Sequence, residues 1–267
     1  MHENQKLQDI FNLCARHDDG RALLSFLLEK NVPVISDESV PYAVTAMYFF
    51  IREKKLLVNT DKLFITLQES KDAPTLAECL LHEARHVQQA FGGAATPGMR
   101  VSPDDYAWFI RVTEADAEAT AALIAFKMKV AGFPEVFDAA KKEFPHCAKI
   151  YETAEREYER NPGSLDTPAF KRKLFDAWFL TNDKSRYDTQ CIQRFAEIDD
   201  FCAKLPKRDL PRTAVEKIGT CGGEPVNYLT LDGFRPLDDP YYKDIRIENP
   251  MVCLHRDSLM MTWKMAP

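Results

Sequence analysis

Two histidines and a glutamate share the spacing His82-Glu83-x-x-His86 within residues 80–89. On a helix, residues four apart lie on one face, one turn above each other, so both imidazoles could bind one metal ion. Zinc is the metal expected first. It accepts imidazole nitrogen, and with three protein ligands it keeps a position for a water molecule whose pKa falls to about 7. Glu83 lies beside this face, where its carboxylate could take a proton from that water and return it to a leaving amine. The sequence therefore predicts a hydrolytic site with one zinc ion per chain.

The segment that carries this motif has an apolar face separate from the histidine face. At 100° per residue, the apolar side chains form one stripe, while His82 and His86 fall on a different side. Gly92-Gly93 follows, as is typical of a helix C-terminus. The stripe consists of Leu76, Leu80, Ala84, Val87 and Phe91.

A third ligand is expected on the next helix, predicted at residues 103–131 with Ser102 as its N-cap. The candidates are Glu114, Asp116 and Glu118. Glu114 and Glu118 share a helix face, whereas Asp116 projects roughly 160–200° away and cannot join either at one site. Two carboxylates on a buried side of a helix need a metal or hydrogen-bonding partners.

The His82-Glu83-x-x-His86 motif followed 28 residues later by Glu114-x-x-Ala117-Glu118 resembles the gluzincin pattern of zinc metallopeptidases. It is similar to that of small bacterial families described as putative metallopeptidases, among them the uncharacterised family DUF6782. The resemblance covers about 40 residues.

This resemblance implies that His82, His86 and Glu114 are metal ligands and that Glu83 is the general base. It also implies that Glu118 orients a ligand histidine through a hydrogen bond. Related families have Asp or Asn at the position of Glu118, and Glu is one methylene longer. An exchange of roles, with Glu118 as ligand and Glu114 as support, therefore stays open.

The expected function is that of a zinc-dependent metallohydrolase, most simply a peptidase acting on a peptide or protein. The alternative is a non-catalytic interaction module, either stapled by zinc or free of metal. The presence of Glu83 favours the enzyme, because a structural zinc site does not need a general base. Four other residues (His146, Tyr187, Tyr228 and His255) could donate to an oxyanion, but packing or surface roles are favoured for them.

The composition and charge of the chain limit the classes of binding partner and the cellular compartment that are expected. A net charge of −6 without a cluster of Lys and Arg disfavours nucleic acid and anionic lipid. No stretch is long and apolar enough to span a membrane, and the N-terminus lacks the apolar core of a signal peptide. A cytoplasmic protein is expected, although export without a signal would leave the same sequence. Seven scattered cysteines without a Cys-x-x-Cys indicate reduced thiols. No pattern predicts an oligomeric state.

The expected fold is mainly α, of the α+β class. A zincin-like catalytic domain is predicted at residues 1–163, and a mostly helical C-terminal extension packed on it at 164–267, irregular after 220. Residues 43–51 and 56–58 are expected to form a β-hairpin, with a further strand at 63–67, although 47–51 could equally be buried helix. Other helices are expected at 5–17, 21–30, 134–160, 168–180 and 183–205.

Overall fold

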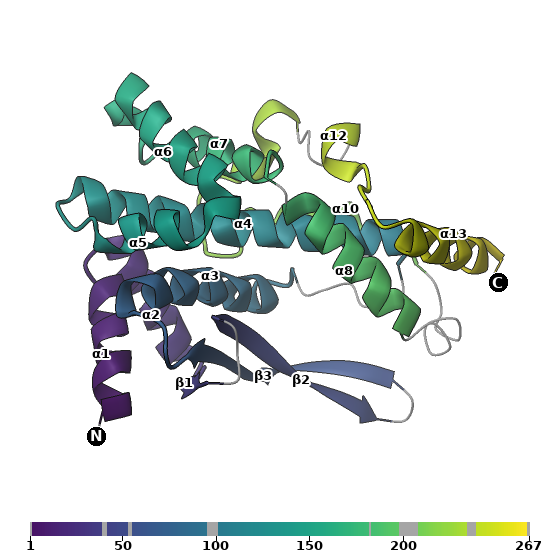
Figure 1. Cartoon of the computed structure of the whole chain (residues 1–267), viewed down its shortest axis with the longest axis horizontal. Helices are drawn as coiled ribbons and strands as arrows, with labels where there is room; N and C mark the ends of the chain where they lie inside the picture. The colour runs from purple at the N-terminus through teal and green to yellow at the C-terminus, as the bar shows by residue number, and fades with distance from the viewer. Residues whose placement is uncertain are drawn as a thin grey trace.

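The computed structural model describes residues 2–38, 42–52, 55–94, 101–181, 183–197, 208–233 and 239–265. These residues form a mainly helical protein with one small mixed sheet near the N-terminus, which confirms the predicted class. In Figure 1 the sheet lies along one side, α3 lies between the sheet and α4, and α6 and α7 lie beyond α4. The molecule is thus layered around two long helices.

The sheet has the strand order β1-β3-β2, with β1 parallel and β2 antiparallel to β3. The predicted hairpin is confirmed, and the alternative of a buried helix at residues 47–51 is wrong. The strands predicted separately at 56–58 and 63–67 form one continuous strand, which pairs with β2 across a bulge between Ala46 and Tyr48. The polar residues 53–54 between the two strands lie outside the described part. The strands span Val34–Asp37 (β1), Ala43–Arg52 (β2) and Lys55–Gln68 (β3).

The two long helices begin at side-chain N-caps, of which the one at Ser102 was predicted. The Asp72 side chain accepts a hydrogen bond from the Thr75 backbone at the start of α3, and Ser102 accepts one from Asp105 at the start of α4. Gly92 caps the end of α3, as predicted. Most of the predicted loop between these helices, residues 95–100, is outside the described part. The first helices span His2–Cys14 (α1), Asp18–Glu29 (α2), Ala73–Phe91 (α3) and Pro103–Val130 (α4).

The single helix predicted at residues 134–160 is wrong, because the chain forms two helices separated by a short 3-10 turn at Pro145–Cys147. Proline lacks a backbone N–H and ends the preceding helix. The prediction of irregular structure after residue 220 is also wrong for Pro250–Met265, which is a helix. Residues 198–205, predicted to continue α8, are not among those described. These helices span Glu135–Glu143 (α5), Ala148–Arg160 (α6), Pro168–Trp178 (α7), Asp183–Glu197 (α8), Arg212–Ile218 (α10), Pro240–Lys243 (α12) and Pro250–Met265 (α13), with 3-10 turns at Pro162–Ser164 and Tyr228–Gly233.

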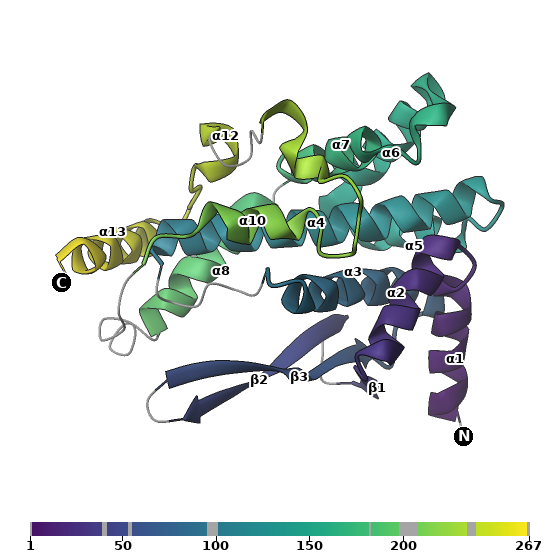
Figure 2. The same ribbon diagram turned by 180° about the vertical axis from the view of Figure 1, so that it is seen from behind.

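One hydrophobic core joins both parts of the chain. Seen from behind in Figure 2, α10 lies along α4, so α4 is covered on several sides. From α7, Phe170, Leu174 and Phe175 belong to the same core as the buried residues of α3 and α4. The division at residue 163 stays a prediction. Among the described helices, none has the length and apolar character that crossing a membrane requires.

Candidate metal centre

The predicted ligand residues come together between α3 and α4. His82 and His86 lie on α3, away from its buried apolar stripe, and face Glu114 and Glu118 of α4. Their Nε2 atoms are 3.0 Å apart, and Glu114 Oε2 lies 3.4 Å from each. One ligand atom from each of His82, His86 and Glu114 lies within 4.8 Å of the others, which makes a group that could hold a metal ion.

The other ring nitrogen of each histidine has a fixed acceptor. His82 Nδ1 lies 3.1 Å from Glu118 Oε2, and His86 Nδ1 lies 2.8 Å from Gln89 Oε1. The amide nitrogen of Gln89 donates to the Thr113 carbonyl, so its oxygen faces His86 and must accept. Both histidines therefore carry a proton on Nδ1, and both Nε2 atoms turn toward Glu114.

The arrangement fits a zinc ion. Two lone pairs on Nε2 atoms 3.0 Å apart, beside a carboxylate oxygen, repel one another unless a cation or a proton lies between them. Tetrahedral zinc, with ligand distances of about 2.0–2.2 Å, sets its ligand atoms about 3.3–3.6 Å apart. The separations of 3.0, 3.4 and 3.4 Å are close to these values. Two imidazoles and one carboxylate are also a donor set that zinc accepts.

The two histidines and the acids beside them shift one another's pKa values. Burial lowers the pKa of His82, but hydrogen bonds to Glu114 and Glu118 outweigh it and raise that pKa well above its usual value. The pKa of His86 is raised too, because Glu114 outweighs the effect of burial. The pKa of Glu114 is held well below its usual value by the two histidines, despite burial. The group therefore holds an ionised carboxylate that attracts positive charge.

Glu83 lines the same cavity as His82 and Glu114, and this cavity has a volume of about 210 Å³. Glu83 follows His82 directly on α3, and its role as a general base stays a prediction. The aromatic side chains of Tyr42, Phe144 and Trp178 form part of the wall. A cavity bounded by both apolar rings and acid side chains can admit a polar chain with an apolar side group.

Sequence reasoning did not identify Glu78, which lies one helical turn before His82. Burial and the nearby Glu118 raise the pKa of Glu78 to about 8. The hydroxyl of Tyr151 lies 3.3 Å from a carboxylate oxygen of each of these acids. The i, i+4 spacing between Glu78 and His82 is the sequence signal that could have identified Glu78.

Two of the four residues considered as oxyanion donors line the cavity. Tyr187, on α8, donates a hydrogen bond of 2.8 Å to Glu114 Oε2, and His146 lies in the wall. Tyr228 instead donates to Asp116 on the opposite side of α4, and His255 is exposed on α13. Tyr187 is distant in sequence from the motif, so only the packing of α8 against α4 brings it here.

Asp116 points away from the metal group, as helical geometry predicts. Arg85 Nε donates to Asp116 Oδ2 at 2.7 Å, and both side chains are almost fully buried. Gln89 donates to the same carboxylate oxygen at 2.9 Å while it accepts from His86. Gln89 thus joins the metal group to the Arg85–Asp116 ion pair. The i, i+3 spacing of Gln89 from His86 could have revealed the contact between these two residues. The contact of Gln89 with Asp116 depends on tertiary structure.

Comparison with known proteins identifies a family. No curated protein and no solved structure matches the chain. The Putative metallopeptidase family (DUF6782) matches residues 50–223, which include α3, α4 and every residue of the metal group. The match extends over more than half of the sequence, and the chain belongs to this family.

Proposed function

We propose that the protein is a zinc-dependent metallohydrolase that cleaves peptide bonds, with His82, His86 and Glu114 as the zinc ligands. The observation that carries this proposal is the convergence of the two Nε2 atoms and the Glu114 oxygen at 3.0–3.4 Å. It is the one such group found among the described residues. The contacts support Glu114 as the ligand and Glu118 as the support, because Glu118 accepts from Nδ1 of His82.

The chain's own residues supply binding and proton transfer. Zinc, when bound, polarises a peptide carbonyl and lowers the pKa of water. Glu83 accepts the proton of the attacking water and delivers it to the nitrogen of the leaving amine. Glu118 and Gln89 hold the two imidazole rings in orientation, and the Tyr187 hydroxyl fixes the Glu114 carboxylate. The substrate is a peptide or protein segment that enters the cavity beside Glu83.

A cavity beside three protein ligands favours the enzyme over a structural zinc module. Structural zinc sites are closed by four protein ligands, whereas catalytic sites use three and leave a position open. The 210 Å³ cavity leaves space at the group, and Glu83 lines it.

The test is Glu83→Gln, with Glu152→Gln on the exposed face of α6 as the matched control. Zinc content by elemental analysis is expected to be about one ion per chain in the wild type and in both variants. Hydrolysis of a mixed peptide library is expected in the wild type and the control but not in Glu83→Gln, because the proton acceptor is lost.

Each result has a clear meaning. If Glu83→Gln hydrolyses peptides as fast as the wild type, the proposed role of Glu83 as general base is wrong. Stoichiometric zinc without hydrolysis in the wild type would support the zinc-stapled interaction module. A wild type that takes up no zinc even when zinc is added would support the metal-free module.

A further inference from the structure

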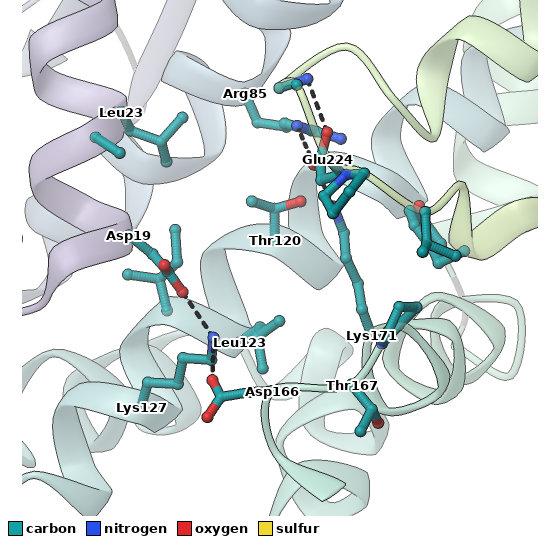
Figure 3. Close-up of a pocket in the computed structure, with 18 of the residues that line it drawn as sticks. Asp19, Leu23, Arg85, Thr120, Leu123, Lys127, Asp166, Thr167, Lys171 and Glu224 are labelled. Carbon is teal, nitrogen blue, oxygen red and sulfur yellow. Dashed lines mark hydrogen bonds and ion pairs between the residues drawn. The ribbon is translucent and has the colours of Figure 1, made fainter.

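A second cavity, of about 520 Å³, is lined in part by other residues of α3 and α4 (Figure 3). It is bordered by α2, α3, α4, the start of α7 and the loop at residues 222–226, and it shares no lining residue with the cavity at the metal group. Its volume falls within the range of roughly 300–1,000 Å³ that small-molecule sites occupy. The proposed peptidase mechanism uses none of it.

The wall of this cavity is mostly apolar, with cations gathered at one end. Arg85 and Lys171 reach that end, and their side chains are only 1% and 9% exposed. Figure 3 shows both directed toward Glu224. The apolar part of the wall includes Leu23, Leu123, Ile124, Leu165 and Val226.

The buried charges at this end do not balance without the loop. Arg85 and Lys171 share the fully buried Asp116, at 2.7 Å and 3.3 Å, which leaves one positive charge in excess. Glu224 supplies the missing negative charge, 2.7 Å from Arg85 and 3.3 Å from Lys171. A buried charge without a partner is costly, so the excess cation requires some anion at this position.

Glu224 reaches the cavity from a loop, whereas Arg85 and Lys171 reach it from helices. Its side chain is 29% exposed, and it follows Gly222-Gly223, where Gly223 has a φ of +80°. Gly222 passes so close to Arg85 that a Cβ would lie 2.5 Å from the guanidinium, and its N–H donates to Glu224 at 2.9 Å. The anion is thus held by a short glycine turn, while its cationic partners are held by two helices.

We propose that this cavity binds a small organic monocarboxylate with an apolar body, whose carboxylate takes the place of Glu224 on Arg85 and Lys171. The exchange keeps the buried charge balanced, because one carboxylate replaces another and Glu224 moves into water. The apolar body of the ligand then covers the leucine and isoleucine side chains of the wall.

The opposite end of the cavity selects for a single acid group. There Lys127 is paired with both Asp19 and Asp166, each at 2.7 Å, which leaves one negative charge in excess. A second carboxylate on the ligand would meet repulsion at this end. The charge pattern therefore favours a monoacid over a diacid.

The test uses octanoate as the probe and the full-length chain labelled with 15N. The backbone amide of Gly222 is the reporter, because it donates to Glu224 in the unliganded protein. Octanoate is expected to shift this signal in a saturable way. 1-Octanol, which has the same chain without the charge, and acetate, which has the charge without the chain, are expected to leave it nearly unchanged.

Two variants separate charge replacement from simple partition into an apolar cavity. Glu224→Gln removes the competing carboxylate, so octanoate should bind about tenfold more tightly if the loop occupies the site about nine-tenths of the time. Lys171→Met removes one cation and should abolish saturable binding. Equal octanoate affinity in all three proteins, or equal binding of octanol and octanoate, would overturn the proposal.

The wild-type titration alone remains decisive if a variant fails to fold. A Gly222 signal that does not move with octanoate contradicts the proposal, as does octanoate that shifts only signals near Glu83. Neither result bears on the peptidase proposal, which depends on zinc content and on hydrolysis by the Glu83 variants.

Discussion

At the scale of single residues, the geometry of the candidate metal group (His82, His86 and Glu114) depends on residues outside that group. Each imidazole is oriented by one hydrogen bond from Nδ1, and the two acceptors differ in kind: Glu118 carries a charge and Gln89 does not. Gln89 holds its position through Thr113 and Asp116. The orientation of His86 is therefore set by a neutral amide that is itself held at two points.

We predict that Gln89→Leu weakens zinc binding roughly 10–100-fold, because His86 loses the acceptor that fixes its ring. The measurement is competition for zinc with a chromophoric chelator. Gln88→Leu is the matched control, since Gln88 is also buried on α3 but accepts from Arg85 instead of a histidine. An equal loss of zinc affinity in both variants would mean that the effect comes from general destabilisation of α3.

At the scale of elements, α8 joins the metal site to a buried charge cluster. Its Tyr187 contacts Glu114, and the next residue, Asp188, lies 3.2 Å from Arg111 of α4. Both charged side chains are fully buried, yet Arg111 Nε and Asp188 Oδ1 have no hydrogen-bond partner among the described residues. Burial raises the pKa of Asp188 to about 6, although Arg111 opposes this.

This raised pKa predicts how stability depends on pH. Between about pH 4 and 6, Asp188 keeps a proton in the folded protein that it has lost in the unfolded chain. Its contribution to the free energy of unfolding therefore falls as pH rises through this range and is level above pH 6. Asp188→Asn should remove this fall, which is worth roughly 3 kcal/mol for a shift of about two pKa units. The measurement is urea unfolding at several pH values, compared with Asp257→Asn on the exposed face of α13. Parallel pH curves for wild type and Asp188→Asn would contradict the prediction.

The elements that sequence could predict are those whose signals are local. The cap at Ser102 and the apolar stripe of α3 predicted the two long helices, and helical angles alone separated Asp116 from Glu114 and Glu118. The packing of these two helices brings the candidate ligands together, whereas the choice between Glu114 and Glu118 was left open by the sequence.

Other features depend on contacts between distant segments. Tyr187 reaches Glu114 only through the packing of α8 on α4, and Arg85 finds its charge partners on α4 and in the loop at Glu224. Helix α13 was missed because its inward residues, Val252 and Leu259, pack into a small separate cluster rather than forming a strong stripe. Information of this kind is not present in any short window of sequence.

At the scale of the whole molecule, the C-terminal part completes the core of the N-terminal part. Phe170 of α7 stacks on Phe126 of α4 with ring centroids 6.3 Å apart, and Trp178 lines the cavity at the metal group. The buried Asp116 also takes Lys171 and Tyr228 as partners. Residues on both sides of position 163 thus supply the core and the site.

We therefore predict that a fragment of residues 1–163 does not fold with fixed tertiary structure, because α4 would expose its face toward α7 and Asp116 would lose partners. The measurement is near-UV circular dichroism together with the cooperativity of urea unfolding. A chain that lacks only α13 is the control, since that helix packs in the separate cluster, and it should still unfold cooperatively. Cooperative unfolding of the 1–163 fragment would show that residues 1–163 fold independently.

The alternation of acids along α4 has a mechanical consequence. Glu114 and Glu118 meet histidines on one side, while Asp116, between them in sequence, meets Arg85 on the other. Any rotation of α4 about its own axis would pull carboxylates away from both sets of partners at once. The helix is therefore held against rotation from two sides, and Glu114 Oε2 stays directed at both histidines.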